Sequence, residues 1–215
     1  MSKLIAVMGE SGAGKTTSMR NLDPKTTMYI DCDKKGLSWK GWREQYNKEN
    51  KNYIVSDDPD YVLKMVQMVS NSPDFQHIKV VIIDTINGLM VADEMRRIKE
   101  KGYDKWQDLA ISVYNLVDKA LTFRDDLTII FTAHTQTDRE DSGYMFTHIK
   151  TSGRKLDKIV LESKFPVVLL AKVMDGAYKF ETKADSSTAK VPMGAIEDQY
   201  IDNDITKVID ALKDY

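Results

Sequence analysis

Short apolar runs alternate with longer amphipathic stretches along this sequence. Residues 78–84 form the clearest run, because the four residues from Val80 to Ile83 are all β-branched. An apolar run of this length is typical of a strand that is buried on both faces of a parallel sheet. The pattern predicts strands at residues 4–8, 27–31, 53–56, 78–84 and 127–133.

Helical periodicity is found between these runs. In residues 58–70, for example, Val62, Val66 and Val69 fall on one helical face. Helices are predicted at residues 15–22, 58–70, 86–99, 104–123, 154–161 and 205–212, with a further short helix inside residues 34–51.

The last third of the chain predicts a β-hairpin. Residues 165–173 and 177–182 flank Asp175 and Gly176, a dipeptide that favours a tight turn. Residues 135–152 are polar, and we expect an irregular loop there.

Strands that alternate with helices predict an α/β fold, with a mainly parallel sheet, helices on both faces and this C-terminal β-hairpin. No repeat or shift in composition divides the chain, so residues 1–215 are predicted to form one domain.

Composition narrows the classes of protein that fit. Lys and Arg number 31 and Asp and Glu 33, which gives a net charge of −2. This balance excludes a generally basic nucleic-acid binder but allows a local basic surface. The single Cys32 cannot form an internal disulfide, and a reducing cytoplasm is the expected location. No apolar run reaches the length of a membrane span, so no membrane partner is expected.

A phosphate-binding motif follows the first predicted strand. Residues 9–16 fit the pattern G-x-x-x-x-G-K-[ST] and stand where a strand gives way to a predicted helix. In such a loop the backbone N–H groups surround the phosphates of ATP, the Lys reaches the β- and γ-phosphates, and the Thr holds Mg²⁺. The residues predicted to bind the nucleotide are Gly9, Glu10, Ser11, Gly12, Ala13, Gly14, Lys15, Thr16 and Thr17.

Acidic residues end two other predicted strands. Asp84 closes residues 78–84 and is the predicted second residue of the metal site, binding Mg²⁺ through water. The alternative is that Asp84 caps the following helix. Asp33 is the preferred base that activates water, Asp31 comes second, and Glu10 is a weaker choice. Both strand-end acids could instead serve only in a turn.

Polar residues also follow the strand at residues 127–133. His134 and Gln136 would lie at the same edge of a parallel sheet as the phosphate loop. A side chain there can sense the γ-phosphate by hydrogen bonding, and both residues are candidates. The alternative is a structural His at a strand end.

Four segments in this order resemble the core of RecA-like ATPases: GESGAGKT, IDCD, VVIIDT and TAHTQ. The resemblance implies a water-activating acid at Asp33, where RecA itself has Glu, and a polar sensor at His134 or Gln136. The segment TAKVPMG at residues 188–194 is similar to the tail of phage-encoded RecA-like ATPases of the single-strand annealing class. This second resemblance implies that Lys190 acts in the ATP site of a neighbouring subunit.

The resemblance to the phage proteins also implies partners and a location. It implies a homo-oligomer that binds single-stranded DNA and promotes annealing or recombination in the cytoplasm of a host cell. A single-strand DNA-binding protein is a further partner of such a role. The resemblance does not distinguish a ring from a filament.

Two segments combine cations with aromatic rings, as single-strand binding requires. One holds Tyr144 and Phe146, and its basic residues are Lys150, Arg154, Lys155 and Lys158. The other holds Trp39 and Trp42, and its basic residues are Lys34, Lys35, Lys40 and Arg43. The Trp residues are also spaced as a helical packing stripe, and this segment could instead cover the nucleotide or contact a neighbouring subunit.

Two other functions remain open at the level of sequence. A nucleotide or small-molecule kinase shares the phosphate loop but usually needs an arginine-bearing lid, and Arg139 and Arg154 are the only arginines after Arg124. A DNA-binding scaffold that binds nucleotide without hydrolysing it would result if Asp33 does not activate water.

Overall fold

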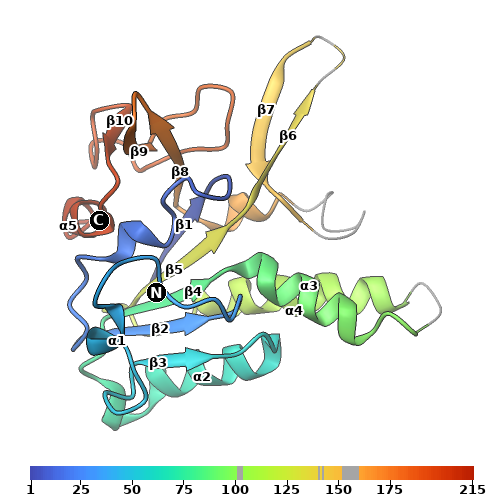
Figure 1. Ribbon diagram of the computed structural model, residues 1–215, viewed down its shortest axis with the longest axis vertical. Helices are drawn as coiled ribbons and strands as arrows, with labels where there is room; N and C mark the ends of the chain where they lie inside the picture. The colour runs from blue at the N-terminus through green and yellow to red at the C-terminus, as the bar shows by residue number, and fades with distance from the viewer. Residues whose placement is uncertain (101–103, 140, 142, 152–159) are drawn as a thin grey trace.

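An eight-stranded sheet forms the centre of the computed structural model, which describes residues 1–100, 104–139, 141, 143–151 and 160–215. The strands lie in the order β10-β9-β8-β1-β5-β4-β2-β3 (Figure 1). The first six in chain order are parallel, β9 runs antiparallel to β8, and β10 runs antiparallel to β9. Their bounds are β1 (Lys3–Met8), β2 (Thr27–Asp31), β3 (Tyr53–Val55), β4 (Val80–Asp84), β5 (Thr128–Ala133), β8 (Val167–Met174), β9 (Ala177–Glu181) and β10 (Tyr200–Asp202). The predicted α/β class is confirmed.

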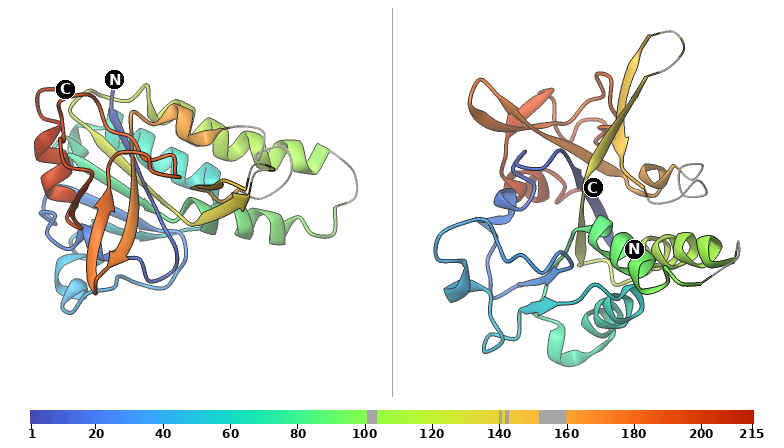
Figure 2. Two further views of the ribbon diagram at one scale, coloured as in Figure 1. Left: turned by 90° about the horizontal axis from the view of Figure 1, so that it is seen from above. Right: turned by 45° about the vertical axis from the view of Figure 1, so that its right-hand side comes forward.

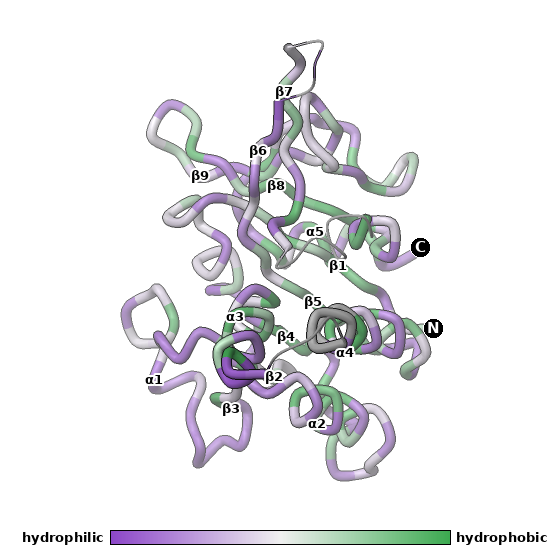
Figure 3. Tube along the Cα trace, turned by 90° about the vertical axis from the view of Figure 1, so that its right-hand side faces the viewer, coloured by the Kyte–Doolittle hydropathy of each residue, from purple (hydrophilic) through white to green (hydrophobic). Residues whose placement is uncertain are grey.

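Alternate residues of β1 face two halves of the core. Leu4, Ala6 and Met8 pack with one set of helices, and Ile5 and Val7 pack with the elements on the opposite face. The first set is α2 (Pro59–Asn71), α3 (Ile86–Arg96) and α4 (Asp104–Ala120), and the second face carries α5 (Ile205–Ala211) and the short α1 (Trp42–Gln45). Figure 2 shows helices on both faces, as predicted. In Figure 3 hydrophobic residues follow β1, β5 and β8 through the centre of the molecule.

The helix predicted at residues 15–22 is wrong in extent. Only a single 3-10 turn, Thr17–Met19, forms there. Hydroxyl side chains compete for the backbone in this segment, and the Ser18 hydroxyl donates to the Lys15 carbonyl at 2.6 Å. The Arg20 guanidinium likewise donates to the Thr17 carbonyl at 3.0 Å, so carbonyls that a longer helix would use are engaged by side chains.

The loop predicted at residues 135–152 is also wrong, because a second hairpin forms there. Its strands are β6 (Thr135–Arg139) and β7 (Met145–Ile149), and it projects beyond the main sheet (Figure 1). Only its root is buried, so most of the hairpin lacks the apolar alternation by which a strand is recognised. Thr137 and Thr147 pair across the two strands through their hydroxyls at 2.9 Å.

Other local predictions agree with the structure. The turn between β8 and β9 has positive φ at Asp175 and Gly176, as the Asp-Gly dipeptide predicts. Asp58 caps α2 and accepts from the backbone of Asp60 and Tyr61. Most of the helix predicted at residues 154–161 falls outside the described residues, and a 3-10 turn, Leu161–Lys164, follows it. None of the helices in the described part of the chain is long and apolar enough to cross a bilayer.

Candidate nucleotide-binding site

The phosphate loop leaves the carboxyl end of β1, at the centre of the sheet. Glycine is required at both conserved places of the pattern for reasons of space. A Cβ on Gly9 would stand 2.8 Å from the Ala171 carbonyl oxygen, and one on Gly14 would stand 2.8 Å from Cδ1 of Tyr178. Gly14 also has a φ of 94°. The neighbouring strands β8 and β9 therefore fix the course of the loop.

Lys15 lies folded over this loop and is buried. Its Nζ donates to the carbonyls of Gly9 at 2.8 Å and Glu10 at 2.9 Å. Burial lowers the pKa of Lys15 to about 8, and the charge of Asp84 opposes this shift. Carbonyls are weak partners for an ammonium group, and phosphate oxygens placed in the loop would be stronger ones.

Asp84 lies at the end of β4 within a set of three hydroxyl groups. Its carboxylate accepts from the hydroxyls of Thr16 at 2.8 Å and Thr132 at 2.5 Å, and from the phenol of Tyr29. The helix-cap alternative for Asp84 is wrong, since Thr85 is the N-cap of α3 and accepts from the Gly88 N–H. A hydroxyl and a carboxylate side by side are the oxygen ligands that Mg²⁺ prefers, so the donor set fits this ion.

The two acids after β2 differ in their surroundings. Asp31 is buried and accepts from the Gly36 N–H at 2.8 Å and the Tyr53 phenol at 2.7 Å, which gives it a structural place in the following turn. Asp33 is partly exposed, pairs with Lys35 at 2.6 Å and accepts from the Thr85 hydroxyl at 2.9 Å. Asp33 therefore contacts the residue that follows Asp84, the predicted metal ligand, and its other oxygen is held by the Lys35 ammonium.

The two candidates for the γ-phosphate sensor, His134 and Gln136, lie in different places. His134 follows β5, and its Nδ1 lies 3.5 Å from Nζ of Lys15. Burial and the charge of Lys15 lower the pKa of His134, which favours the neutral ring. Gln136 instead donates to Asp138 at 3.2 Å within the hairpin. Of the two, His134 is the side chain that reaches the phosphate loop.

Residues 2–188 match the family described as AAA domain. The chain belongs to this family. It is a P-loop ATPase, and the loop at residues 9–16 is its predicted ATP-binding feature. No curated protein matches the sequence.

Two solved structures are similar to the chain of this ATPase. One is the P4 protein from bacteriophage phi6 in complex with ADP, at 15% identity and a TM-score of 0.42. The other is the P4 protein from bacteriophage phi13, at 13% identity and the same TM-score of 0.42. Each match covers 84% of this chain and 55% of the other chain. The ATPase therefore spans about half the length of these two proteins.

Several side chains around the ATPase site were missed by the sequence prediction. Tyr29 and Thr132 hold Asp84, and both interrupt otherwise apolar strands. Such polar interruptions are the signal that could have identified them. Asn87 in the first turn of α3 was missed as well. Its amide accepts from the His134 N–H at 2.7 Å and donates to the Lys150 carbonyl at 2.8 Å, and no local pattern indicates that contact.

The basic residues predicted to bind DNA lie in different settings. Lys35 pairs with Asp33 at the ATP site, and Lys34 pairs with Asp57 at 2.6 Å. Arg43 lies over the Trp42 ring, while Lys40 and Lys150 are exposed. Trp39 and Trp42 pack against the core, as the packing alternative predicts. Three of the predicted residues fall outside the described part of the chain: Arg154, Lys155 and Lys158.

Lys190 is exposed, and its backbone pairs with Val168 of β8 through two hydrogen bonds of 2.8 Å. Its ammonium forms no ion pair with any residue that the structure describes. The side chain is thus available to a neighbouring molecule, and its action on a second ATP site stays a prediction.

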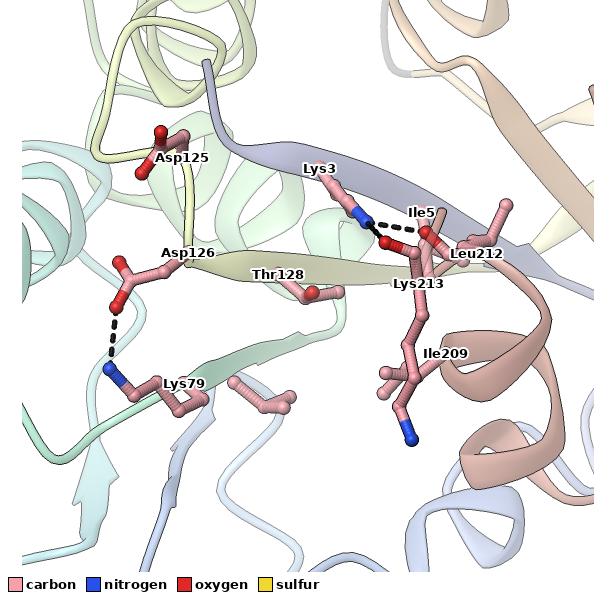
Figure 4. Close-up of a pocket in the computed structure, with 10 residues that line it drawn as sticks. Lys3, Ile5, Lys79, Asp125, Asp126, Thr128, Ile209, Leu212 and Lys213 are labelled. Atoms are coloured by element: carbon pink, nitrogen blue, oxygen red, sulfur yellow. Dashed lines mark hydrogen bonds and ion pairs between the residues drawn. The ribbon is translucent and has the colours of Figure 1, made fainter. Parts of the chain in front are cut away.

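A pocket of about 200 Å³ lies at the opposite edge of the sheet (Figure 4). Its lysines are engaged, since Lys79 pairs with Asp126, Lys213 pairs with Asp210, and Lys3 donates to the carbonyls of Leu212 and Lys213. The lysines of this pocket are therefore held by the protein itself.

Proposed function

We propose that this ATPase hydrolyses ATP with Mg²⁺ and couples the reaction to binding and annealing of single-stranded DNA. One observation carries the proposal. The exposed β6–β7 hairpin bears a row of aromatic rings, and it begins directly after His134, the residue that contacts the Lys15 side chain. A change at the γ-phosphate would therefore act directly on the root of a nucleic-acid-binding element.

The residues at the ATP site have complementary roles in hydrolysis. Thr16 and Asp84 would hold Mg²⁺, which neutralises charge on the β- and γ-phosphates when bound. Lys15 exchanges its two loop carbonyls for phosphate oxygens. Asp33 accepts the proton of the attacking water, and His134 donates a hydrogen bond to the γ-phosphate. Lys35 pairs with Asp33 and orients its carboxylate.

The hairpin has the features of a surface for stacking bases. The rings of Tyr144 and Phe146 lie 6.5 Å apart, and those of Phe146 and His148 lie 6.0 Å apart and nearly parallel. Tyr144 is 48% exposed. Stacking on such rings tolerates any sequence, which suits a protein that pairs arbitrary strands. Lys150 at the root supplies a cation for the phosphate backbone.

Asn87 connects the two functions. Its side chain bonds to the first residue beyond β5 and to the residue that follows β7, so one amide holds both strands of the hairpin at their root. Asn87 belongs to α3, whose N-cap Thr85 also bonds to Asp33. A shift of Asp33 or His134 during hydrolysis would reach the hairpin through this amide.

An oligomer completes the proposal. Lys190 is exposed and would enter the ATP site of a neighbouring subunit, and adjacent subunits would extend the track of rings along the DNA. A single-strand DNA-binding protein would act as a further partner by delivering the coated strand.

The test is ATP turnover of the purified protein with and without single-stranded DNA. Turnover in the wild type should rise with DNA. Lys15→Ala should abolish turnover, and Tyr144→Ala with Phe146→Ala should remove only the stimulation. Tyr61→Ala, a tyrosine of similar exposure on α2, is the matched control. Turnover that is indifferent to DNA would refute the coupling, and ATP binding without turnover would favour the scaffold function.

A further inference from the structure

The carboxamide of Asn203 is buried beside the phosphate loop without a hydrogen-bond partner. Asn203 is 3% exposed, and neither Oδ1 nor Nδ2 bonds to any described residue. A buried amide without partners destabilises a fold. Its presence next to a ligand-binding loop therefore points to a ligand that supplies the missing bonds.

Two side chains meet the loop at the same point. A Cβ on Gly14 would stand 3.2 Å from Oδ1 of Asn203 and 2.8 Å from Cδ1 of Tyr178. Since β8 is the parallel neighbour of β1, the chain turns back after β8, and β9 brings Tyr178 next to the loop. The Tyr178 ring is 48% exposed.

The segment that carries Asn203 is fixed to the chain that leaves the phosphate loop. Arg20 donates to the Asn203 carbonyl at 2.7 Å and to the Thr17 carbonyl at 3.0 Å, and Asn21 donates to Asp204 at 2.7 Å. The ribose and base of a nucleotide extend from the α-phosphate, beyond the end of the loop. This is the side on which Asn203 and Tyr178 lie.

We propose that Tyr178 and Asn203 bind the base of the nucleotide and select adenine through its N7 edge. The Tyr178 ring offers a stacking face, and the Asn203 carboxamide offers a donor beside an acceptor. On the N7 edge adenine presents an acceptor and a donor, which match the carboxamide, whereas guanine presents two acceptors there and leaves the carboxamide oxygen unpaired. The carboxamide is covered in the structure, so the base reaches it when the half-exposed ring turns aside and becomes the stacking surface.

The inference rests on the phosphate loop as the ATP site and is independent of DNA binding. Asn203 also lies outside residues 2–188, the part of the chain that matches the family. Base selection by this side chain is therefore a property of the chain itself and does not follow from membership of the family.

The test compares binding of ADP, GDP and pyrophosphate to the full chain by calorimetry. Pyrophosphate has no base, so its affinity measures binding by the phosphate loop alone. The wild type should bind ADP about tenfold more tightly than GDP, and Asn203→Ala should remove that preference, because one satisfied buried amide accounts for an effect of roughly this size. Pyrophosphate affinity should not change.

Two further variants separate base recognition from folding. Asn203→Asp keeps the side-chain shape but loses the donor, and it should weaken ADP binding as Asn203→Ala does. Tyr178→Ala should weaken ADP and GDP alike, by about tenfold, because stacking does not discriminate between bases, whereas Tyr61→Ala should weaken neither. Thermal unfolding confirms that each variant is folded.

Two results would overturn the inference. One is equal binding of ADP and GDP by the wild type. The other is an equal loss of ADP and pyrophosphate binding in Asn203→Ala, which would make Asn203 a support of the loop. Either result leaves the ATPase and its coupling to DNA intact, while a wild type that binds no pyrophosphate and no ADP would contradict the phosphate loop itself.

Discussion

The phosphate-loop edge and the β6–β7 hairpin are built in opposite ways. At the edge, Asp84 and Lys15 are buried and their polar groups bond to neighbouring strands or to the loop itself. In the hairpin only the root is buried, at Thr135 and Ile149, while rings toward the tip stand in solvent. The edge is therefore organised in the absence of a ligand, whereas the proposed DNA would meet an exposed ring, Tyr144, on the hairpin.

The largest effect is expected from removing Asp33, the proposed base at the phosphate-loop edge. Asp33→Asn keeps the contact with Thr85 but loses the basic oxygen, so kcat for ATP should fall by about a hundredfold or more. ADP affinity, measured by calorimetry, should change little. Asp57→Asn is the matched control, because Asp57 pairs with Lys34 of the same segment. Wild-type turnover in Asp33→Asn would remove Asp33 from the mechanism.

A pH titration of ADP affinity measures how strongly nucleotide binding depends on the buried ammonium group of Lys15. The pKa of Lys15 is lowered to about 8 by burial, and bound phosphate raises it again. Below pH 8 the free protein already carries the proton, whereas above pH 8 it must take one up on binding. ADP affinity without metal should therefore fall by about tenfold per pH unit above 8.

Lys15→Arg is the control for this titration, since arginine stays protonated. Its affinity for ADP should be flat between pH 8 and 9.5. A flat profile in the wild type would show that the ammonium stays protonated in the free loop.

The smallest effect tests the link between the two regions. Asn87→Ala frees both strands of the hairpin at the root, so stimulation of turnover by DNA should fall about fivefold, the lower end of typical coupling between sites. Asn87→Asp keeps the acceptor for the His134 N–H and loses the donor to the Lys150 carbonyl. Its stimulation of turnover by DNA should therefore lie between that of the wild type and that of Asn87→Ala. Full stimulation in Asn87→Ala would show that the hairpin is coupled by another route.

The same contrast explains what the sequence could predict. The strands of the sheet and the phosphate loop follow from apolar runs and from one motif, because burial and backbone geometry dictate those residues. The hairpin was missed, since strands exposed on both faces carry no periodic apolar pattern. Asn87 and Asn203 act through contacts with residues more than 45 positions away, and a local pattern contains no trace of such contacts. The helix predicted after the phosphate loop was too long, because side chains bond to the backbone carbonyls that a longer helix would use.

The bonds from Arg20 and Asn21 to Asn203 and Asp204, and from Lys3 to Leu212, join residues that lie 183 to 209 positions apart in the sequence. Synthesis on the ribosome proceeds from the N-terminus at about 5–20 residues per second. The phosphate loop therefore emerges well before the segment that packs against it. Until residues 203 and 204 have been made, a nascent chain carries the phosphate-binding motif without the segment that is fixed to it in the folded protein.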